Sequence, residues 1–156
     1  IKDVTVKARY LDLSDMKIKE INNKEIEFEY RNSLFQKHLD KVVLETWFHL
    51  KPANPNVIKD KMENIKKERW VKQPREYPNC GSVFKRPKGY YVGALIEKLG
   101  LKGYNMGGAQ LSEKHAGFII NSDNATGYDI LRLIDFIRDE VKMNFGVELE
   151  LEQRII

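Results

Sequence analysis

Residues 78–87 read Pro-Asn-Cys-Gly-Ser-Val-Phe-Lys-Arg-Pro and come directly after a proline-marked linker. Two glycine-rich stretches follow, GLKG at residues 100–103 and GGAQLSEKHAGF at residues 107–118. Glycines allow tight turns and the close approach of the backbone to a ligand. Lysine, arginine and histidine placed among them are suited to binding phosphate or carboxylate groups. The pattern predicts loops that hold an anionic ligand.

The part of the chain before the linker has the alternating pattern of β-structure. Residues 3–12 and residues 25–30 alternate apolar and polar side chains, and residues 41–50 are more apolar throughout. Alternation with a period of two predicts half-buried strands. The pair Asn22–Asn23 is typical of a turn between strands. We therefore expect residues 1–50 to form an antiparallel β unit.

A helix is predicted just before the linker at residues 73–78. The pair Asn54–Pro55 supplies an N-cap and a first helical residue. Ile58, Met62 and Ile65 then recur at helical spacing. The lysines between them are typical of a solvated helix face.

The part after the linker mixes helices and strands. A short helix is expected at Val92–Leu99, and residues 115–121 predict a buried strand. Thr126 and Asp129 have the spacing of a capping box at the start of the longest helix, which Gly146 ends. The apolar stripe of this helix is Ile130, Ile134, Ile137, Val141 and Phe145.

The end of the chain predicts one more strand. Residues 147–152 alternate valine or leucine with glutamate, which places the glutamates on one face. Strands followed by a mixture of short helices and strands indicate an α+β fold. The linker at residues 73–78 is the expected domain boundary. Both ends of the sequence look cut, so we expect a fragment.

Composition limits the classes of function. The 156 residues carry 27 basic and 23 acidic side chains, a net charge of +4. These charges are dispersed, so a small anionic ligand explains the excess as well as nucleic acid does. No apolar run reaches the ~20 residues of a membrane helix. The single cysteine, Cys80, excludes an internal disulfide and indicates a reducing, cytoplasmic location.

Taken one at a time, the candidate residues favour structural roles. Ser82 lies in neither G-x-S-x-G nor S-x-x-K and is more typical of a turn or cap. Cys80 is expected to be a small packed residue. Arg31 at a strand end and Glu152 on the polar side of a strand are typical surface residues. The histidines lack the spacing of metal ligands, so no metal site is predicted.

Six segments in one order nevertheless resemble the UDP-N-acetylenolpyruvoylglucosamine reductase family, also called UDP-N-acetylmuramate dehydrogenases. They are YRNSLF (30–35), PNCGSVFKRP (78–87), GLKG (100–103), GGAQLSEKHAGFIIN (107–121), NAT (124–126) and FGVELELEQR (145–154). The resemblance spans nearly the whole chain, and its two central blocks are highly specific. The short links between the segments resemble the shorter variety of the family, which lacks a tyrosine-bearing loop.

The resemblance implies a flavoenzyme of peptidoglycan precursor synthesis. In that family NADPH reduces FAD, and hydride then passes to the enolpyruvyl double bond of UDP-N-acetylglucosamine enolpyruvate. By resemblance, Ser82 donates a proton to the carbon next to the substrate carboxylate. Arg31 would stabilise the charge on that carboxylate, and Glu152 would act on the same group while holding or sharing a proton.

The resemblance also places residues at the UDP moiety. Lys102, Arg86 and His115 match positions near the nucleotide, and Gln110 is a weaker candidate. Tyr30 would pack beside the flavin or the substrate. No nucleic acid, membrane or protein partner is indicated.

The matching segments imply three regions. Residues 1–74 would be the later part of a flavin domain, residues 75–147 a substrate domain, and residues 148–156 a tail strand that returns to the flavin domain. The glycine-rich first FAD segment of the family is absent, so we expect the chain by itself to bind FAD poorly and to be inactive. Two alternatives remain, namely a non-catalytic nucleotide-sugar-binding module and a nucleic-acid binder that uses the basic helix at residues 59–72.

Overall fold

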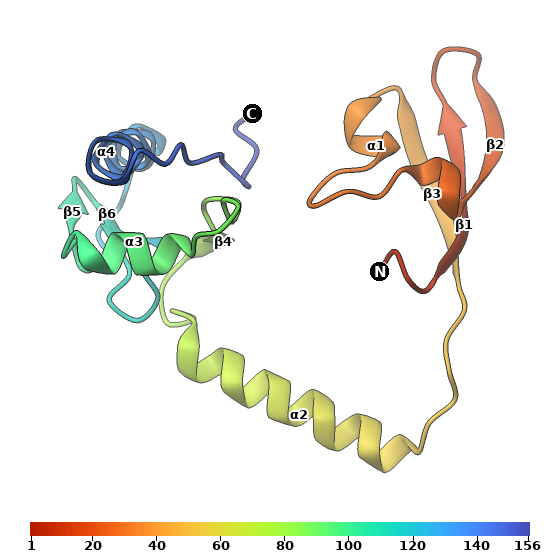
Figure 1. Cartoon of the computed structure of the whole chain (residues 1–156), viewed down its shortest axis with the longest axis horizontal. Coiled ribbons are helices and arrows are strands. Elements are labelled where there is room, and N and C mark those ends of the chain that lie inside the picture. Colours follow the sequence, from red (N-terminus) through yellow and green to blue (C-terminus); the bar gives the residue numbers. More distant parts are fainter. The chain divides into compact units, whose positions relative to one another are not determined.

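The computed structural model covers residues 1–156 and divides into two compact units, Ile1–Val57 and Ile58–Ile156, which we describe separately (Figure 1). The elements are β1 (Thr5–Asp12), β2 (Lys17–Asn22), η1 (Asn23–Ile26), α1 (Leu34–Lys37), β3 (Lys41–Phe48), α2 (Pro55–Lys72), β4 (Asn79–Ser82), α3 (Val92–Lys98), β5 (Asn105–Met106), β6 (Ala109–Leu111), β7 (Phe118–Asn121) and α4 (Gly127–Phe145). Each unit contains an antiparallel sheet together with helical segments, so the predicted α+β class is confirmed. None of the helices combines the length and the apolar character needed to cross a membrane.

The first unit is built on a three-stranded antiparallel sheet in the order β2-β1-β3. The strands predicted at residues 3–12 and 41–50 are confirmed as β1 and β3. Ala8 and Tyr10 of β1 are buried, as expected for the central strand of the sheet. The second strand is β2, whose charged sequence KIKEIN does not stand out as a strand.

The strand predicted at residues 25–30 is wrong. Asn23–Ile26 form the 3-10 helix η1, and Glu27 follows with a left-handed φ of +53°. The Glu25 carboxylate accepts a hydrogen bond from the backbone N–H of Asn22 (3.0 Å), which stabilises this helical turn. Residues 25–30 therefore alternate in polarity, but local hydrogen bonds favour a helical turn at their start. Strand β2 ends at Asn22, the first residue of the asparagine pair.

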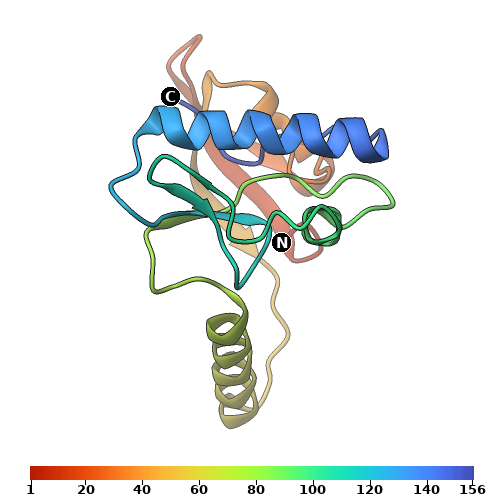
Figure 2. The ribbon, with the colours of Figure 1, turned by 90° about the vertical axis from the view of Figure 1, so that its left-hand side faces the viewer.

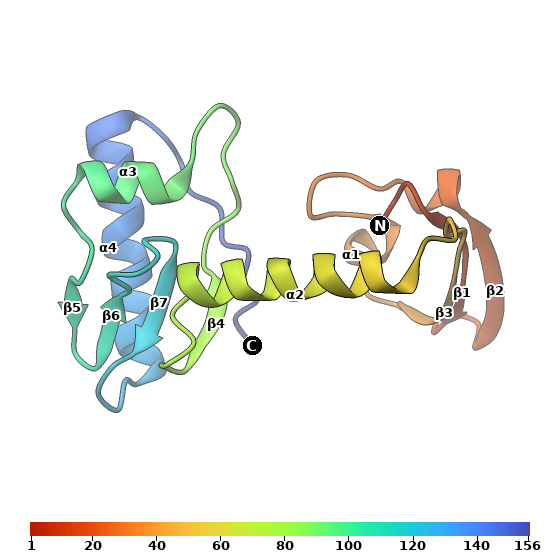
Figure 3. The ribbon, with the colours of Figure 1, turned by 90° about the horizontal axis from the view of Figure 1, so that it is seen from below.

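The second unit contains a four-stranded antiparallel sheet in the order β4-β7-β6-β5 (Figure 3). The strand predicted at residues 115–121 is confirmed over its last four residues. The hairpin of β5 and β6 lies within the stretch that the sequence predicts as loop. Strands of two and three residues carry too little periodicity to be recognised from the sequence.

Helix α4 covers one face of this sheet, and α3 packs beside it (Figure 2). Its predicted caps are confirmed, because the Thr126 hydroxyl accepts a hydrogen bond from the Asp129 N–H (3.1 Å) and Gly146 ends the helix with a φ of +65°. Its predicted stripe faces the core, where Ile134, Ile137 and Val141 are buried. The core also includes Val83, Phe84, Leu95, Ile96, Leu111, Ile119, Leu133 and Leu149.

The tail at residues 147–152 is not the regular strand that its alternation predicts. Val147 and Leu149 are buried and the glutamates are more exposed, so the predicted in-and-out pattern is confirmed. Regular pairing is limited to one bridge, Phe84 with Leu151. The tail meets its partner over too few residues to form a ladder.

Helix α2 begins as predicted, since the Asn54 side chain accepts a hydrogen bond from the backbone N–H of Asn56 (2.9 Å). No residue of this helix is buried. Its apolar residues at helical spacing are therefore exposed, unlike those of α4.

Candidate functional site

Ser82 ends strand β4 at an irregularity of the sheet. It pairs with Phe118 of β7, but the register shifts between Asn79 and Ser82. Gly81, with a φ of +83°, supplies the backbone conformation that this shift requires. Such a bulge redirects the side chain that follows it. The Ser82 side chain is exposed although the next two residues belong to the core.

Cys80 belongs to the same irregular stretch. Its side chain is exposed, so the expectation of a packed cysteine is wrong. Asn79 and Ser82 of the same strand are exposed as well, so this part of β4 lies outside the core.

Glu152 lies beside Val83, the residue after Ser82, because the tail runs antiparallel to the segment that follows β4. The Glu152 backbone N–H donates to the carbonyl oxygen of Val83 (2.9 Å), and the Lys85 N–H donates to that of Glu150 (2.8 Å). The structure therefore brings together the backbone segments that carry two of the three predicted catalytic residues. The third, Arg31, belongs to the first unit.

Tyr30 and Arg31 form the tip of a tight turn in the first unit. The Glu29 N–H donates to the Asn32 carbonyl oxygen (2.9 Å), and the reverse bond measures 3.4 Å. Arg31 has a left-handed φ of +56°, which is rare for a residue with a Cβ and is often found at functional positions. The guanidinium carbon lies 5.9 Å from the centre of the exposed Tyr30 ring. An aromatic ring and a cation are thus presented together on a turn.

Arg86 and Lys102 are two of the residues that the family resemblance places near the nucleotide. Arg86 stacks on Tyr91, with 3.7 Å between the guanidinium carbon and the ring centre, and donates to the Tyr90 carbonyl oxygen (3.3 Å). Lys102 lies 3.4 Å from a Glu97 carboxylate oxygen. Both are exposed and belong to the second unit, the unit that contains Ser82.

His115 is half-buried in the turn before β7, where its ring packs edge-on against Phe118 at 4.6 Å between centres. Its Nδ1 accepts a hydrogen bond from the Gly117 N–H (3.1 Å). Because Nδ1 acts as the acceptor, a neutral His115 carries its proton on Nε2, where it can be donated to an anion. Gln110 in β6 donates to the Gly103 carbonyl oxygen (3.2 Å), which connects it to the GLKG loop.

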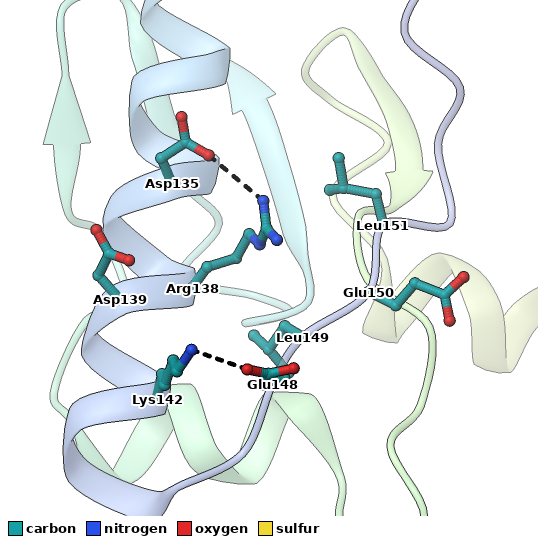
Figure 4. Close-up of a pocket in the computed structure, with 8 residues that line it drawn as sticks. All are labelled: Asp135, Arg138, Asp139, Lys142, Glu148, Leu149, Glu150 and Leu151. Carbon is teal, nitrogen blue, oxygen red and sulfur yellow. Dashed lines mark hydrogen bonds and ion pairs between the residues drawn. The ribbon is translucent and has the colours of Figure 1, made fainter.

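A groove of about 920 Å³ lies between α4 and the tail (Figure 4). Four of its charged side chains form ion pairs within the groove, with Lys142 2.8 Å from Glu148 and Arg138 3.6 Å from Asp135. None of the site residues predicted from the sequence lines this groove. Its volume alone therefore does not make it the candidate site.

Comparison with known proteins assigns the family. A family model described as "UDP-N-acetylenolpyruvoylglucosamine reductase, C-terminal domain" matches residues 73–156. The chain belongs to this reductase family. The resemblance found in the sequence motifs is thereby confirmed.

Individual family members match over the whole of the chain. The UDP-N-acetylenolpyruvoylglucosamine reductase of Caldanaerobacter subterraneus subsp. tengcongensis is 50% identical over 156 residues, which are 100% of this chain and 51% of that protein. The protein of the same name from Limosilactobacillus reuteri is 47% identical over 155 residues, covering 99% and 51%. The crystal structure of UDP-N-acetylenolpyruvylglucosamine reductase (MurB) from Thermus caldophilus is similar with a TM-score of 0.80 at 27% identity, covering 98% of this chain and 53% of that one. The chain thus spans about half the length of the relatives it matches.

Two residues near Ser82 have no role in the interpretation of the sequence motifs. Asn79 and Gln153 both hydrogen-bond Gly81, the residue before the serine. An asparagine two residues before a glycine is a signal for a side-chain-to-backbone turn, which could have identified Asn79. No local signal identifies Gln153, because its partner is 72 residues away in the chain.

Proposed function

We propose that this chain is part of an oxidoreductase of peptidoglycan precursor synthesis, which reduces UDP-N-acetylglucosamine enolpyruvate to UDP-N-acetylmuramate. NADPH is the proposed reductant and FAD the proposed cofactor. Membership of the reductase family supports this proposal. The observation that carries it is the backbone pairing of Glu152 with Val83, which brings the tail against the segment that begins with Ser82.

The proposed reaction needs a proton donor beside the carbon next to the substrate carboxylate, because this carbon becomes electron-rich when hydride adds to the double bond. Ser82 presents its hydroxyl at the exposed end of a bulged strand and is the proposed donor. A serine hydroxyl is a weak acid, so it must be positioned and electrostatically supported. Glu152 and Arg31 are proposed to stabilise the substrate carboxylate. Each such group is worth about 3–4 kcal/mol of transition-state stabilisation.

The proposed diphosphate donors fit an anionic nucleotide sugar. Arg86 and Lys102 supply positive charge. His115 can donate through Nε2–H, because its Nδ1 accepts a hydrogen bond from the Gly117 N–H. Gln110 is the weaker candidate, and its amide nitrogen donates one hydrogen bond to the Gly103 carbonyl oxygen of the GLKG loop. Arginine and histidine donors directed at phosphate oxygens form strong charge-assisted hydrogen bonds.

The first unit offers a partial fit to the flavin. Tyr30 presents an exposed ring beside the Arg31 guanidinium, an arrangement suited to a flat, polar ring system. The flavin supplies hydride to the substrate when it is bound. The chain's own residues would orient the substrate and deliver the proton. We retain residues 1–74, 75–147 and 148–156 as the proposed flavin, substrate and returning-tail regions.

A second candidate function is nucleotide-sugar binding without catalysis. It is favoured by the presence of Arg86, Lys102 and His115 in one unit. Such a module would bind a UDP-sugar but would carry no flavin. Absorbance of a bound flavin in the purified full-length protein separates the two functions.

The decisive experiment is Ser82→Ala in a reductase of full family length that contains residues 1–156. We expect NADPH to bleach the flavin at the normal rate, while reoxidation by the enolpyruvyl substrate nearly stops. Ser122→Ala is the matched control, because Ser122 is an exposed serine of the same unit outside the proposed site. Normal reoxidation by Ser82→Ala would remove the proposed proton donor.

A further inference from the structure

The side-chain amide of Asn79 makes three hydrogen bonds to the backbone of residues 74–81, the segment that leads to Ser82. Its Nδ2 donates to the carbonyl oxygens of Pro74 (2.8 Å) and Tyr77 (2.9 Å). Its Oδ1 accepts from the backbone N–H of Gly81 (3.0 Å). Only one orientation of the amide satisfies all three bonds, because the opposite orientation would direct a donor at a donor. The side chain therefore joins the linker to the bulge in one defined geometry.

Gly81 is held by side chains at the point where the sheet ladder is irregular. The ladder pairs Asn79 with Ile120 and Ser82 with Phe118, and its register shifts between them. The Gly81 N–H is bound by Asn79, and the Gly81 carbonyl oxygen accepts a longer bond from Gln153 Nε2 (3.4 Å). The peptide groups on both sides of Gly81 are thus fixed from outside the ladder.

We propose that Asn79 is a positioning residue that fixes the bulge at Gly81 and thereby the direction of the Ser82 hydroxyl, with Gln153 as a second and weaker support. This inference rests on the proposed role of Ser82. Asn79 is exposed, so its hydrogen bonds act on the conformation of the strand end more than on the core. Because Gln153 directly follows Glu152, its contact also connects the two candidate catalytic segments.

The kinetic test uses Asn79→Ala in the full-length reductase. Small displacements of a reacting group cost up to about 100-fold in rate, so we expect flavin reoxidation by the enolpyruvyl substrate to slow by about 10- to 100-fold. Reduction by NADPH, the Kd for UDP-N-acetylglucosamine and the Tm should stay close to wild type. A residue that only supported the fold would lower the Tm and affect all of these measurements together.

Two further variants define the contact. Asn79→Asp keeps an oxygen acceptor for the Gly81 N–H but loses the donor to Pro74 and Tyr77, so its reoxidation rate should lie between wild type and Asn79→Ala. Asn144→Ala is the matched control, since Asn144 also donates to a backbone oxygen in this unit (2.9 Å to Glu140). This control should keep wild-type rates.

The structural test measures hydrogen exchange of the Gly81 amide in the same proteins. Loss of its acceptor in Asn79→Ala should speed exchange by about tenfold, the effect of one hydrogen bond. An unchanged exchange rate of the Gly81 amide would overturn the proposed positioning of Gly81 by Asn79. If Asn79→Ala does not fold, Gln153→Leu takes its place with an expected severalfold slower reoxidation, and a wild-type rate would overturn the inference.

The reoxidation rates of the two variants distinguish a failure of this inference from a failure of the proposed function. If the flavin of Asn79→Ala is reoxidised at the wild-type rate while that of Ser82→Ala is not reoxidised, the positioning role of Asn79 is overturned and the proposed function still stands. Wild-type reoxidation by Ser82→Ala removes the catalytic basis of both proposals.

Discussion

Gly108 packs against the backbone of Asp123 so closely that a Cβ on Gly108 would lie 1.9 Å from the Asp123 carbonyl oxygen. The Gly108 carbonyl oxygen in turn accepts hydrogen bonds from the backbone N–H groups of Ser122 (3.0 Å) and Asp123 (3.2 Å). The start of β6 and the loop after β7 are joined in this way. This glycine of the GGAQ segment therefore serves the packing of the chain against itself.

Gly108→Ala should strongly destabilise the second unit. The added methyl group meets backbone atoms that cannot move aside, so we expect a loss of at least about 3 kcal/mol in the free energy of unfolding. Gly93→Ala is the matched control, because Gly93 lies in α3 and a Cβ added to it would meet no atom within 4 Å. That control should gain about 0.5–1 kcal/mol from helix propensity. Urea unfolding of both variants checks the prediction, and equal stabilities would contradict it.

Thr126→Ala should weaken the start of α4. The Thr126 hydroxyl accepts a hydrogen bond from the Asp129 N–H, and the Asp129 carboxylate accepts from the Thr126 N–H (2.9 Å). Loss of such a cap costs about 1 kcal/mol. Thr126→Ser retains the hydroxyl and should be close to wild type. A Tm of Thr126→Ala equal to that of Thr126→Ser would show that the cap contributes nothing.

The first unit should become less stable as the pH is lowered, because the Asp12 carboxylate becomes protonated. The hydrogen bond from Lys19 (2.8 Å), with further bonds from Ser14, holds the pKa of the Asp12 carboxyl well below its usual range. The folded pKa is lower than the unfolded value of about 4, so the carboxylate stabilises the fold above that pH. This contribution is lost progressively as the pH falls through the folded pKa.

The measurement compares wild type with Asp12→Asn in chemical unfolding at several pH values. Asp12→Asn should be less stable at pH 7, and the difference should shrink steadily as the solution is made more acidic. Asp3→Asn changes an exposed carboxylate and should show little effect at any pH. If the difference in unfolding free energy between wild type and Asp12→Asn did not depend on pH, the charge of Asp12 would not be the source of its stabilising effect.

Arg31→Gly should separate activity from stability. Glycine adopts the left-handed backbone of this turn without strain, so the free energy of unfolding should be unchanged or rise by up to about 1 kcal/mol. Turnover in the full-length reductase should fall by about 100- to 1000-fold, because the proposed stabilising cation is lost. Arg31→Asn is the control, since asparagine tolerates this backbone conformation but carries no charge. Wild-type turnover in either variant would exclude Arg31 from the reaction.

Local patterns in the sequence predict the long elements of this protein correctly. The capping pair at Thr126 and Asp129, the stop at Gly146 and the stripe of α4 all depend on residues within one helix. The alternation at residues 3–12 and 41–50 is long enough to define β1 and β3. The false strand at residues 25–30 has the same alternation, but a hydrogen bond from the backbone of Asn22 to Glu25 favours a helical turn.

The sequence by itself determined the family, the α+β class and the chemical nature of the candidate groups, because motifs and periodicities are local properties of the chain. Only the tertiary structure decided which of these groups become neighbours. Gly81 and Gln153 are 72 residues apart, and their contact exists because burial of Val147 and Leu149 brings the tail against the segment after β4. Burial and long-range hydrogen bonding depend on the whole fold, so no pattern near Ser82 could have placed the Glu152 backbone against Val83.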